Sequence, residues 1–132
     1  MPLLGDGDGL GGAVLVVDDE PGARQTACDM LRALGFAVHE AANATEALRL
    51  LASRPEIELL YSDVRMPDLS GQDLALRARR FRPELKAILT SAWLDRIHIG
   101  QARFLKKPVR FDALRECVAY TLREPPTIAP AL

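Results

Sequence analysis

Short apolar runs alternate with helical patterns along this chain, and the alternation limits the fold more than any other feature of the sequence. The expected strands are residues 14–17, 36–41, 57–62, 86–90 and 104–105. Helical patterns follow Glu20, Asn43, Gly71 and Pro108. Strands separated by helices in this way form a parallel sheet with helices on both faces and right-handed crossovers. The sequence therefore predicts a doubly wound, five-stranded α/β domain.

Local signals mark the ends of the expected helices. Asn43 with Glu46 three residues later matches the capping box, so a helix is expected to begin there. Gly35 is expected to end the preceding helix, because glycine adopts the backbone conformation found after helix C-termini. The arginines at the end of the helix over residues 72–81 are expected to form a solvated face. They are Arg77, Arg79, Arg80 and Arg82.

Four of the five apolar runs stop at polar residues. These stops are Asp18-Asp19-Glu20, Asp63, Ser91 and Lys106-Lys107. The carboxyl ends of parallel strands share one edge of the sheet, and open α/β sheets bind ligands at that edge. Three carboxylates, a hydroxyl and an ammonium are therefore expected to meet in one place. Such a set suits the Mg²⁺-assisted transfer of a phosphoryl group onto an aspartate.

Acidic residues after a strand are common in solvated loops and at helix N-termini, so the triplet at Asp18 is weak evidence by itself. Carboxylates crowded at one edge repel each other unless a cation joins them, and oxygen ligands favour Mg²⁺. Strand alternation places Lys106 on the opposite face and favours Lys107 as the ammonium. Thr90 and Ser91 both carry a hydroxyl that can donate to a phosphoryl oxygen.

Four motifs together resemble the receiver, or phosphoacceptor, domain of two-component response regulators. They are VLVVDDE (14–20), DVRMPDLSG (63–71), TSAW (90–93) and FLKKP (104–108), and they occur in the family's order. The resemblance covers about residues 13–123 and implies a flavodoxin-like receiver fold. It favours Ser91 over Thr90, because Ser91-Ala92-Trp93 follows the family's pattern of a hydroxyl, a small and an aromatic residue.

The resemblance also implies the role of each site residue. Asp63 is expected to be phosphorylated, and Asp18 and Asp19 are expected to hold Mg²⁺ together with Asp63 and the backbone carbonyl of Arg65. The phosphoryl oxygens are expected to be bound by Ser91 and Lys107. The expected switch pair is Ser91 and Phe104.

The connection between the fourth and fifth strands departs from the family. Only the twelve residues from Ala92 to Arg103 join these strands. A parallel crossover with its helix needs at least about 10–12 residues. The fourth helix of the receiver fold is therefore expected to be shortened or irregular, and to become more ordered on phosphorylation.

Composition narrows the class of protein. The 132 residues are enough for one domain, and the formal net charge of −1 argues against direct nucleic-acid binding. No apolar run approaches the roughly 20 residues of a membrane span, and the N-terminus lacks the pattern of a secretory signal. Cys28 and Cys117 have no CxxC partner, so reduced thiols in the cytoplasm are expected. The expected domain is residues 13–124, with a flexible segment at 1–12 and a tail or linker stub at 125–132.

The expected function is a phosphorylation-switched signalling module rather than an enzyme. Its partners would be a sensor histidine kinase or phosphotransfer protein and a downstream protein or effector domain. The alternative is a phosphohydrolase or phosphotransferase that forms an aspartyl-phosphate on small substrates. The haloacid dehalogenase pattern requires Asp-x-Asp after the first strand, which Asp18-Asp19-Glu20 does not match. A receiver-like domain that is never phosphorylated is disfavoured because every expected site residue is present.

Overall fold

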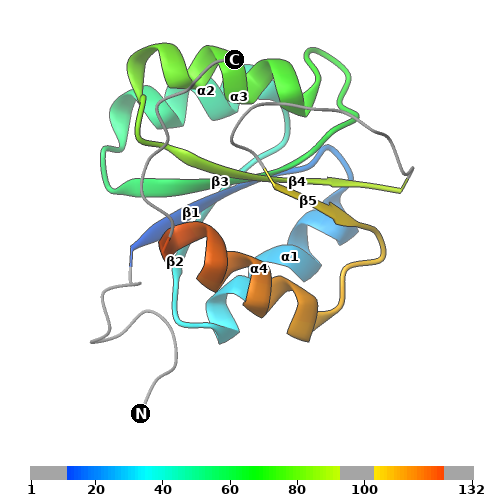
Figure 1. Ribbon diagram of the computed structural model, residues 1–132. Coiled ribbons are helices and arrows are strands. Elements are labelled where there is room, and N and C mark those ends of the chain that lie inside the picture. Colours follow the sequence, from blue (N-terminus) through cyan, green and yellow to red (C-terminus); the bar gives the residue numbers. More distant parts are fainter. Residues whose placement is uncertain (1–11, 93–102, 124–132) are drawn as a thin grey trace.

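A five-stranded sheet between two layers of helices makes up the computed structural model, which describes residues 12–92 and 103–123 (Figure 1). The elements are β1 (Ala13–Val17), α1 (Pro21–Ala33), β2 (Ala37–Ala41), α2 (Ala44–Ser53), β3 (Ile57–Asp63), α3 (Gly71–Phe81), β4 (Lys86–Ser91), β5 (Arg103–Lys106) and α4 (Phe111–Arg123). The strand order is β2-β1-β3-β4-β5, and every neighbouring pair is parallel. The predicted fold class is confirmed, and each expected strand matches within one residue at either end.

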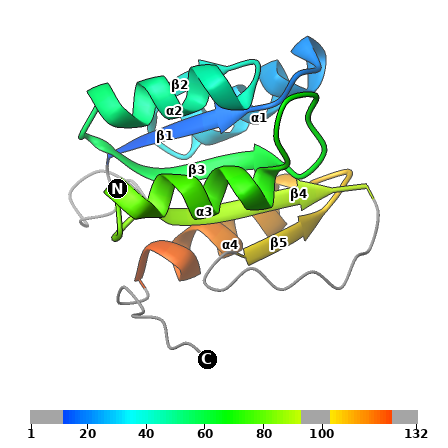
Figure 2. The ribbon, with the colours of Figure 1, turned by 90° about the horizontal axis from the view of Figure 1, so that it is seen from above.

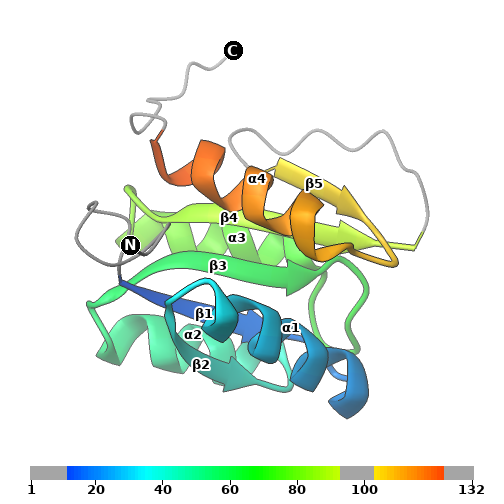
Figure 3. The ribbon, with the colours of Figure 1, turned by 90° about the horizontal axis from the view of Figure 1, so that it is seen from below.

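The helices cover both faces of the sheet. Helices α2 and α3 lie on the face seen in Figure 2, and α1 and α4 lie on the face seen in Figure 3. In β1, Val14 and Val16 pack toward α1 and α4, whereas Leu15 and Val17 pack toward α2 and α3. All five residues of β1 are buried, which explains a continuous apolar run in place of an alternating one. The parallel strands bring their carboxyl ends to one edge of the sheet.

The helix ends follow the local signals in the sequence. The Asn43 side chain accepts from the N–H of Glu46 at 2.8 Å, and the Glu46 carboxylate accepts from the N–H of Ala42 at 2.9 Å. Helix α1 ends at Ala33, and Gly35 follows with φ +101°. Residues other than glycine rarely adopt this backbone conformation, so Gly35 lets the chain turn into β2.

The expectation of a solvated arginine face is wrong for Arg79 and Arg82. The Nε of Arg79 donates to the carbonyl of Leu85 at 3.1 Å. The guanidinium of Arg82 donates to the carbonyl of Leu51 at 3.0 Å and also to the carbonyl of Ile57. Arg82 therefore joins the end of α3 to α2 and to the first residue of β3. The spacing of arginines along a helix does not show where the neighbouring backbone carbonyls lie.

Replacing Arg82 by alanine is expected to lower the free energy of unfolding by about 1–3 kcal/mol, because partly buried carbonyls lose their donor. Arg80→Ala is the matched control, since Arg80 is an exposed arginine in the last turn of α3, two residues before Arg82, and we expect it to change stability by less than about 0.5 kcal/mol. Urea denaturation of the two variants measures the difference. Equal stability of the two variants would contradict a bridging role for Arg82.

Several sequence expectations fall outside the described residues. The short crossover of residues 92–103 includes residues 93–102, which are not described, and neither are residues 1–11 and 124–132. The expected fourth helix and its ordering on phosphorylation therefore stay predictions. Within 12–92 and 103–123, no helix combines the length and apolar character needed to cross a membrane.

Candidate functional site

Three carboxylates meet where β1 and β3 end. Asp18 and Asp19 follow β1, and Asp63 is the last residue of β3. Because Val17 pairs with Ser62, the chain leaving β1 passes Asp63. One carboxylate oxygen from each aspartate lies within 4.8 Å of the other two. Asp18 is buried, Asp63 is partly buried and Asp19 is exposed, so the cluster opens to solvent on one side.

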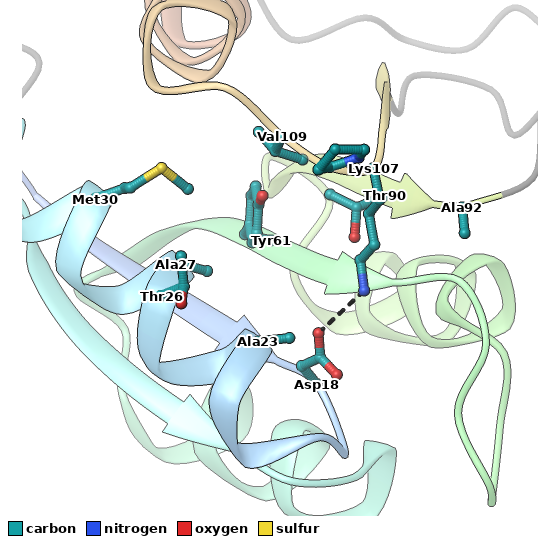
Figure 4. A pocket seen from close by; sticks show the side chains of 11 residues that line it. Asp18, Ala23, Thr26, Ala27, Met30, Tyr61, Thr90, Ala92, Lys107 and Val109 are labelled. Carbon is teal, nitrogen blue, oxygen red and sulfur yellow. Dashed lines mark hydrogen bonds and ion pairs between the residues drawn. The ribbon is translucent and has the colours of Figure 1, made fainter.

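The ammonium group of Lys107 lies against these carboxylates. Its Nζ donates to Oδ2 of Asp63 at 3.0 Å and pairs with Oδ2 of Asp18 at 3.4 Å, the second contact being drawn in Figure 4. The backbone N–H of Lys107 donates to the carbonyl of Ser91 at 2.9 Å, which fixes the chain where it leaves β5. Lys106 is exposed. The structure thus brings Lys107, and not Lys106, to Asp63.

The charges of this cluster are unbalanced. Burial lowers the pKa of Lys107, but the hydrogen bond to Asp63 and the charges of Asp18 and Asp63 outweigh burial and raise the pKa above its ordinary value. Lys107 is therefore positively charged at neutral pH. The three negative charges of the carboxylates against one positive charge leave a formal charge of −2. An excess of crowded carboxylates and an all-oxygen donor set suit a hard divalent cation. The cluster fits a metal ion of this kind.

Two residues that sequence reasoning did not assign to the site hold Asp18 in place. The N–H of Glu20 donates to Oδ1 of Asp18 at 3.0 Å, and the Glu20 carboxylate caps α1 by accepting from the N–H of Ala23 at 2.6 Å. Arg24 donates from Nη1 to the Asp18 carbonyl at 2.8 Å, and its Nε pairs with Glu40 at 3.1 Å. The only signal for Arg24 in the sequence is its position one turn after the acidic triplet.

The connection after β3 is folded closely against Asp63. The N–H of Gly71 donates to the carbonyl of Val64 at 2.8 Å. A Cβ atom at Gly71 would lie 2.4 Å from the carbonyl oxygen of Asp63, so only glycine fits here. The N–H of Arg65 reaches Oδ1 of Asp63 at 3.3 Å. The conformation of residues 64–71 is therefore coupled to the position of the Asp63 carboxylate.

The two candidate hydroxyls lie at the end of β4, and both residues are buried. Thr90 pairs with Asp63 in the register, and its side chain lines a cavity on the α1 side of the sheet. Ser91 is the next residue, and its carbonyl accepts from the N–H of Lys107. Successive side chains of a strand point to opposite faces, so the two hydroxyls occupy different sides of the sheet edge.

Phe104 lies in β5, on the same face of the sheet as Val64 and Leu89. Its partly buried ring packs against these two side chains, which form a small apolar cluster separate from the two main cores. Val64 directly follows Asp63, and Leu89 lies two residues before Ser91. Phe104 is thus connected by packing to the segments that carry the expected phosphorylation and switch residues.

A cavity of about 460 Å³ adjoins the carboxylates on the α1 side (Figure 4). Its walls are α1, the segment after β5 and the side chains of Tyr61 and Thr90, and Asp18 and Lys107 lie at one end. Burial raises the pKa of Tyr61, and the charges of Cys117, Asp18 and Asp63 act in the same direction. The phenol therefore stays neutral beside the charged cluster.

Known proteins are similar to this chain in sequence and in fold. A family model described as the response regulator receiver domain matches residues 14–119. The response regulator protein PilR of Pseudomonas aeruginosa is 35% identical over 115 residues, which are 83% of this chain and 26% of that protein. The sensor kinase CckA of Brucella abortus is 35% identical over 83 residues, which are 62% of this chain and 9% of that protein. The chain thus spans about a quarter or less of the length of these relatives.

Solved structures agree with the sequence relatives. The receiver domain of the hybrid histidine kinase CckA superposes with a TM-score of 0.75 at 34% identity, covering 85% of this chain and 100% of that one. The response regulator TrrA of Thermotoga maritima, solved in complex with Mg²⁺ and BeF, has a TM-score of 0.72 at 29% identity and covers 83% of this chain and 98% of that one. Since the family model spans most of the chain and Asp18, Asp19, Asp63 and Lys107 meet at one sheet edge, the chain belongs to the receiver domain family of two-component response regulators.

Proposed function

We propose that this chain accepts a phosphoryl group on Asp63 from a phosphorylated histidine of a sensor kinase or phosphotransfer protein. The observation that carries the proposal is the contact of the Lys107 ammonium with Asp63 at 3.0 Å, beside the carboxylates of Asp18 and Asp19. Relatives that are sensor kinases and response regulators support a histidine as the donor. The chain acts as a signalling phosphoacceptor, and its phosphorylation changes contacts with a downstream protein or effector domain.

In the transfer, one bond to phosphorus forms and one breaks. A carboxylate oxygen of Asp63 forms a bond to phosphorus while the P–N bond of the phosphohistidine breaks, and the electron pair of that bond returns to the imidazole nitrogen. Both the attacking group and the phosphoryl group are negatively charged, so catalysis depends on positioning and on positive charge. Lys107 supplies positive charge at the nucleophile and binds a phosphoryl oxygen. The Ser91 hydroxyl donates a hydrogen bond to another phosphoryl oxygen.

Mg²⁺ is the metal that suits this site. Hard cations prefer oxygen ligands, and Mg²⁺ binds proteins through a few carboxylates, water and phosphate oxygens. Asp18, Asp19, Asp63 and the backbone carbonyl of Arg65 would hold the ion. When bound, it neutralises charge on the carboxylates and the phosphoryl oxygens. The related response regulator TrrA was solved in complex with Mg²⁺ and BeF, which supports Mg²⁺ as the ion.

Ser91 and Phe104 form the proposed switch. Movement of the Ser91 hydroxyl toward the new phosphoryl group leaves space that the Phe104 ring fills by rotating inward. The packing of Phe104 on Val64 and Leu89 supports this, because a change at the end of β4 alters the surface on which the ring lies. A local charge change thereby shifts the equilibrium between two arrangements of side chains.

We assign the domain to residues 13–124 and place the protein in the cytoplasm. Cys28 and Cys117 are both free thiols among the described residues, which supports a reducing compartment. The formal net charge of −1 supports a protein partner over nucleic acid. Because the relatives are longer than this chain, the effector is proposed either as a separate protein or as a further domain.

Incubation with radiolabelled acetyl phosphate and Mg²⁺ tests the proposed function. We expect labelling to level off at about one phosphoryl group per chain, because one aspartate is modified. Chelation of Mg²⁺ with EDTA is the control and is expected to prevent labelling. Sustained release of phosphate over many turnovers would instead support the alternative, a phosphohydrolase with an aspartyl-phosphate intermediate.

A further inference from the structure

Asp68 links the connection after β3 to a different helix. It lies between Asp63 and α3, and its side chain is exposed. Its Oδ1 accepts from the N–H of Ala44 at 3.1 Å, and its Oδ2 accepts from the N–H and the hydroxyl of Thr45, both at 3.1 Å. Three hydrogen bonds therefore fix this carboxylate to the first turn of α2, more than twenty residues away in the sequence.

The contact completes the N-terminus of α2. The N-cap residue Asn43 accepts from the N–H of Glu46, which leaves the N–H groups of the first two helical residues without an intrahelical partner. Asp68 accepts from both, and its negative charge lies at the positive end of the helix. Slight burial raises the pKa of Asp68, but the hydrogen bonds from Ala44 and Thr45 outweigh burial and lower the pKa. The carboxylate is therefore charged at neutral pH.

The segment that Asp68 anchors also carries Arg65. At its two ends this segment is held by backbone hydrogen bonds, from the N–H of Val64 to the carbonyl of Thr90 at 2.9 Å and from the N–H of Gly71 to the carbonyl of Val64 at 2.8 Å. Between these ends, the side chain of Asp68 ties the segment to α2. Met66 and Leu69 of the segment also pack against the core. Loss of the Asp68 anchor is expected to let the backbone at Arg65 move, and the Arg65 N–H contacts Asp63.

We propose that Asp68 is a positioning residue, which holds the backbone of Arg65 and the carboxylate of Asp63 in the geometry that binds Mg²⁺. The inference rests on the proposed function, because it concerns the affinity of the same site. Asp68 does not touch the carboxylate cluster, and it acts through the conformation of residues 64–71. Helix α2 thereby becomes part of the support of the metal site.

The test is a Mg²⁺ titration of Asp68→Ala at constant ionic strength, with binding measured by calorimetry or by amide chemical shifts. We expect affinity to fall about tenfold, the lower end of the range for residues that orient metal ligands. At limiting Mg²⁺ the rate of labelling by acetyl phosphate should fall by a similar factor. Saturating Mg²⁺ should restore most of that rate, since the nucleophile is unchanged.

Two control variants separate positioning from stability and from charge. Asn43→Ala removes the other cap of α2 without touching the connection after β3, and Asp73→Ala removes an exposed carboxylate in the first turn of α3. The Mg²⁺ affinities of both variants should lie within about twofold of the wild-type affinity, at a temperature where each variant is folded. Asp68→Asn, which keeps one acceptor oxygen, replaces Asp68→Ala if the alanine variant does not fold.

The outcomes distinguish this inference from the proposed function. If the wild type binds Mg²⁺ and Asp68→Ala binds it with the same affinity, the positioning role alone would be overturned. An equal loss in Asn43→Ala would also overturn it, because helix stability and not the anchor would then control affinity. A wild-type protein that neither binds Mg²⁺ nor becomes labelled would overturn the proposed function and this inference with it.

Discussion

Asp63→Asn is expected to abolish phosphoryl labelling by acetyl phosphate or by a phosphorylated kinase. The asparagine amide has nearly the same shape as the carboxylate but lacks a nucleophilic oxygen, so no acyl phosphate forms. In the wild type, the label should be stable in acid and released in base, as expected for a phosphoryl group on a carboxylate. Gel autoradiography after acid and alkaline treatment measures both properties.

Asp68→Asn at saturating Mg²⁺ is the matched control for this experiment. Each substitution removes one negative charge, but Asp68 contacts the N-terminus of α2 and not Lys107. Labelling of Asp68→Asn should therefore reach the wild-type amount. Label that persists in Asp63→Asn would mean that another residue is the nucleophile.

Mg²⁺ affinity is expected to fall by more than about 100-fold when Asp18 and Asp19 are both changed to asparagine, since loss of a direct ligand exceeds the 10–100-fold effect typical of residues that only orient one. The substitutions replace two of the three carboxylates of the cluster. Without metal, the same variant should be as stable as the wild type or more stable, because repulsion between like charges is relieved. Calorimetric titration and thermal unfolding with and without Mg²⁺ measure the two effects.

Asp29→Asn controls for the general loss of negative charge. Asp29 is an exposed carboxylate on α1 and is not one of the three aspartates of the cluster. The Mg²⁺ affinity of the Asp29→Asn variant should match that of the wild type. Unchanged affinity in the Asp18 and Asp19 double variant would place the metal elsewhere, and the proposed ligand set would then be wrong.

The sequence predicted that the site residues meet at one sheet edge, because this depends only on the alternation of strands and helices and on where each apolar run ends. Once five apolar runs alternate with helices, parallel pairing brings Asp63 and the residue after Val17 to the same edge. Strand alternation then places the side chains of Lys106 and Lys107 on opposite faces and favours Lys107 as the ammonium of the site. The roles of Ser91, Phe104 and the Arg65 carbonyl came only from the family resemblance and stay predictions.

The sequence by itself determined the order of the elements, the sheet edge that carries the carboxylates, and local caps such as Asn43, because periodicity and capping depend on residues within a turn or two. Only the tertiary structure decided that Arg82 donates to the carbonyl of Leu51 and that Asp68 anchors α2. Both contacts join segments more than twenty residues apart. Their partners are backbone groups, which every residue carries, so no residue type in the sequence marks them in advance.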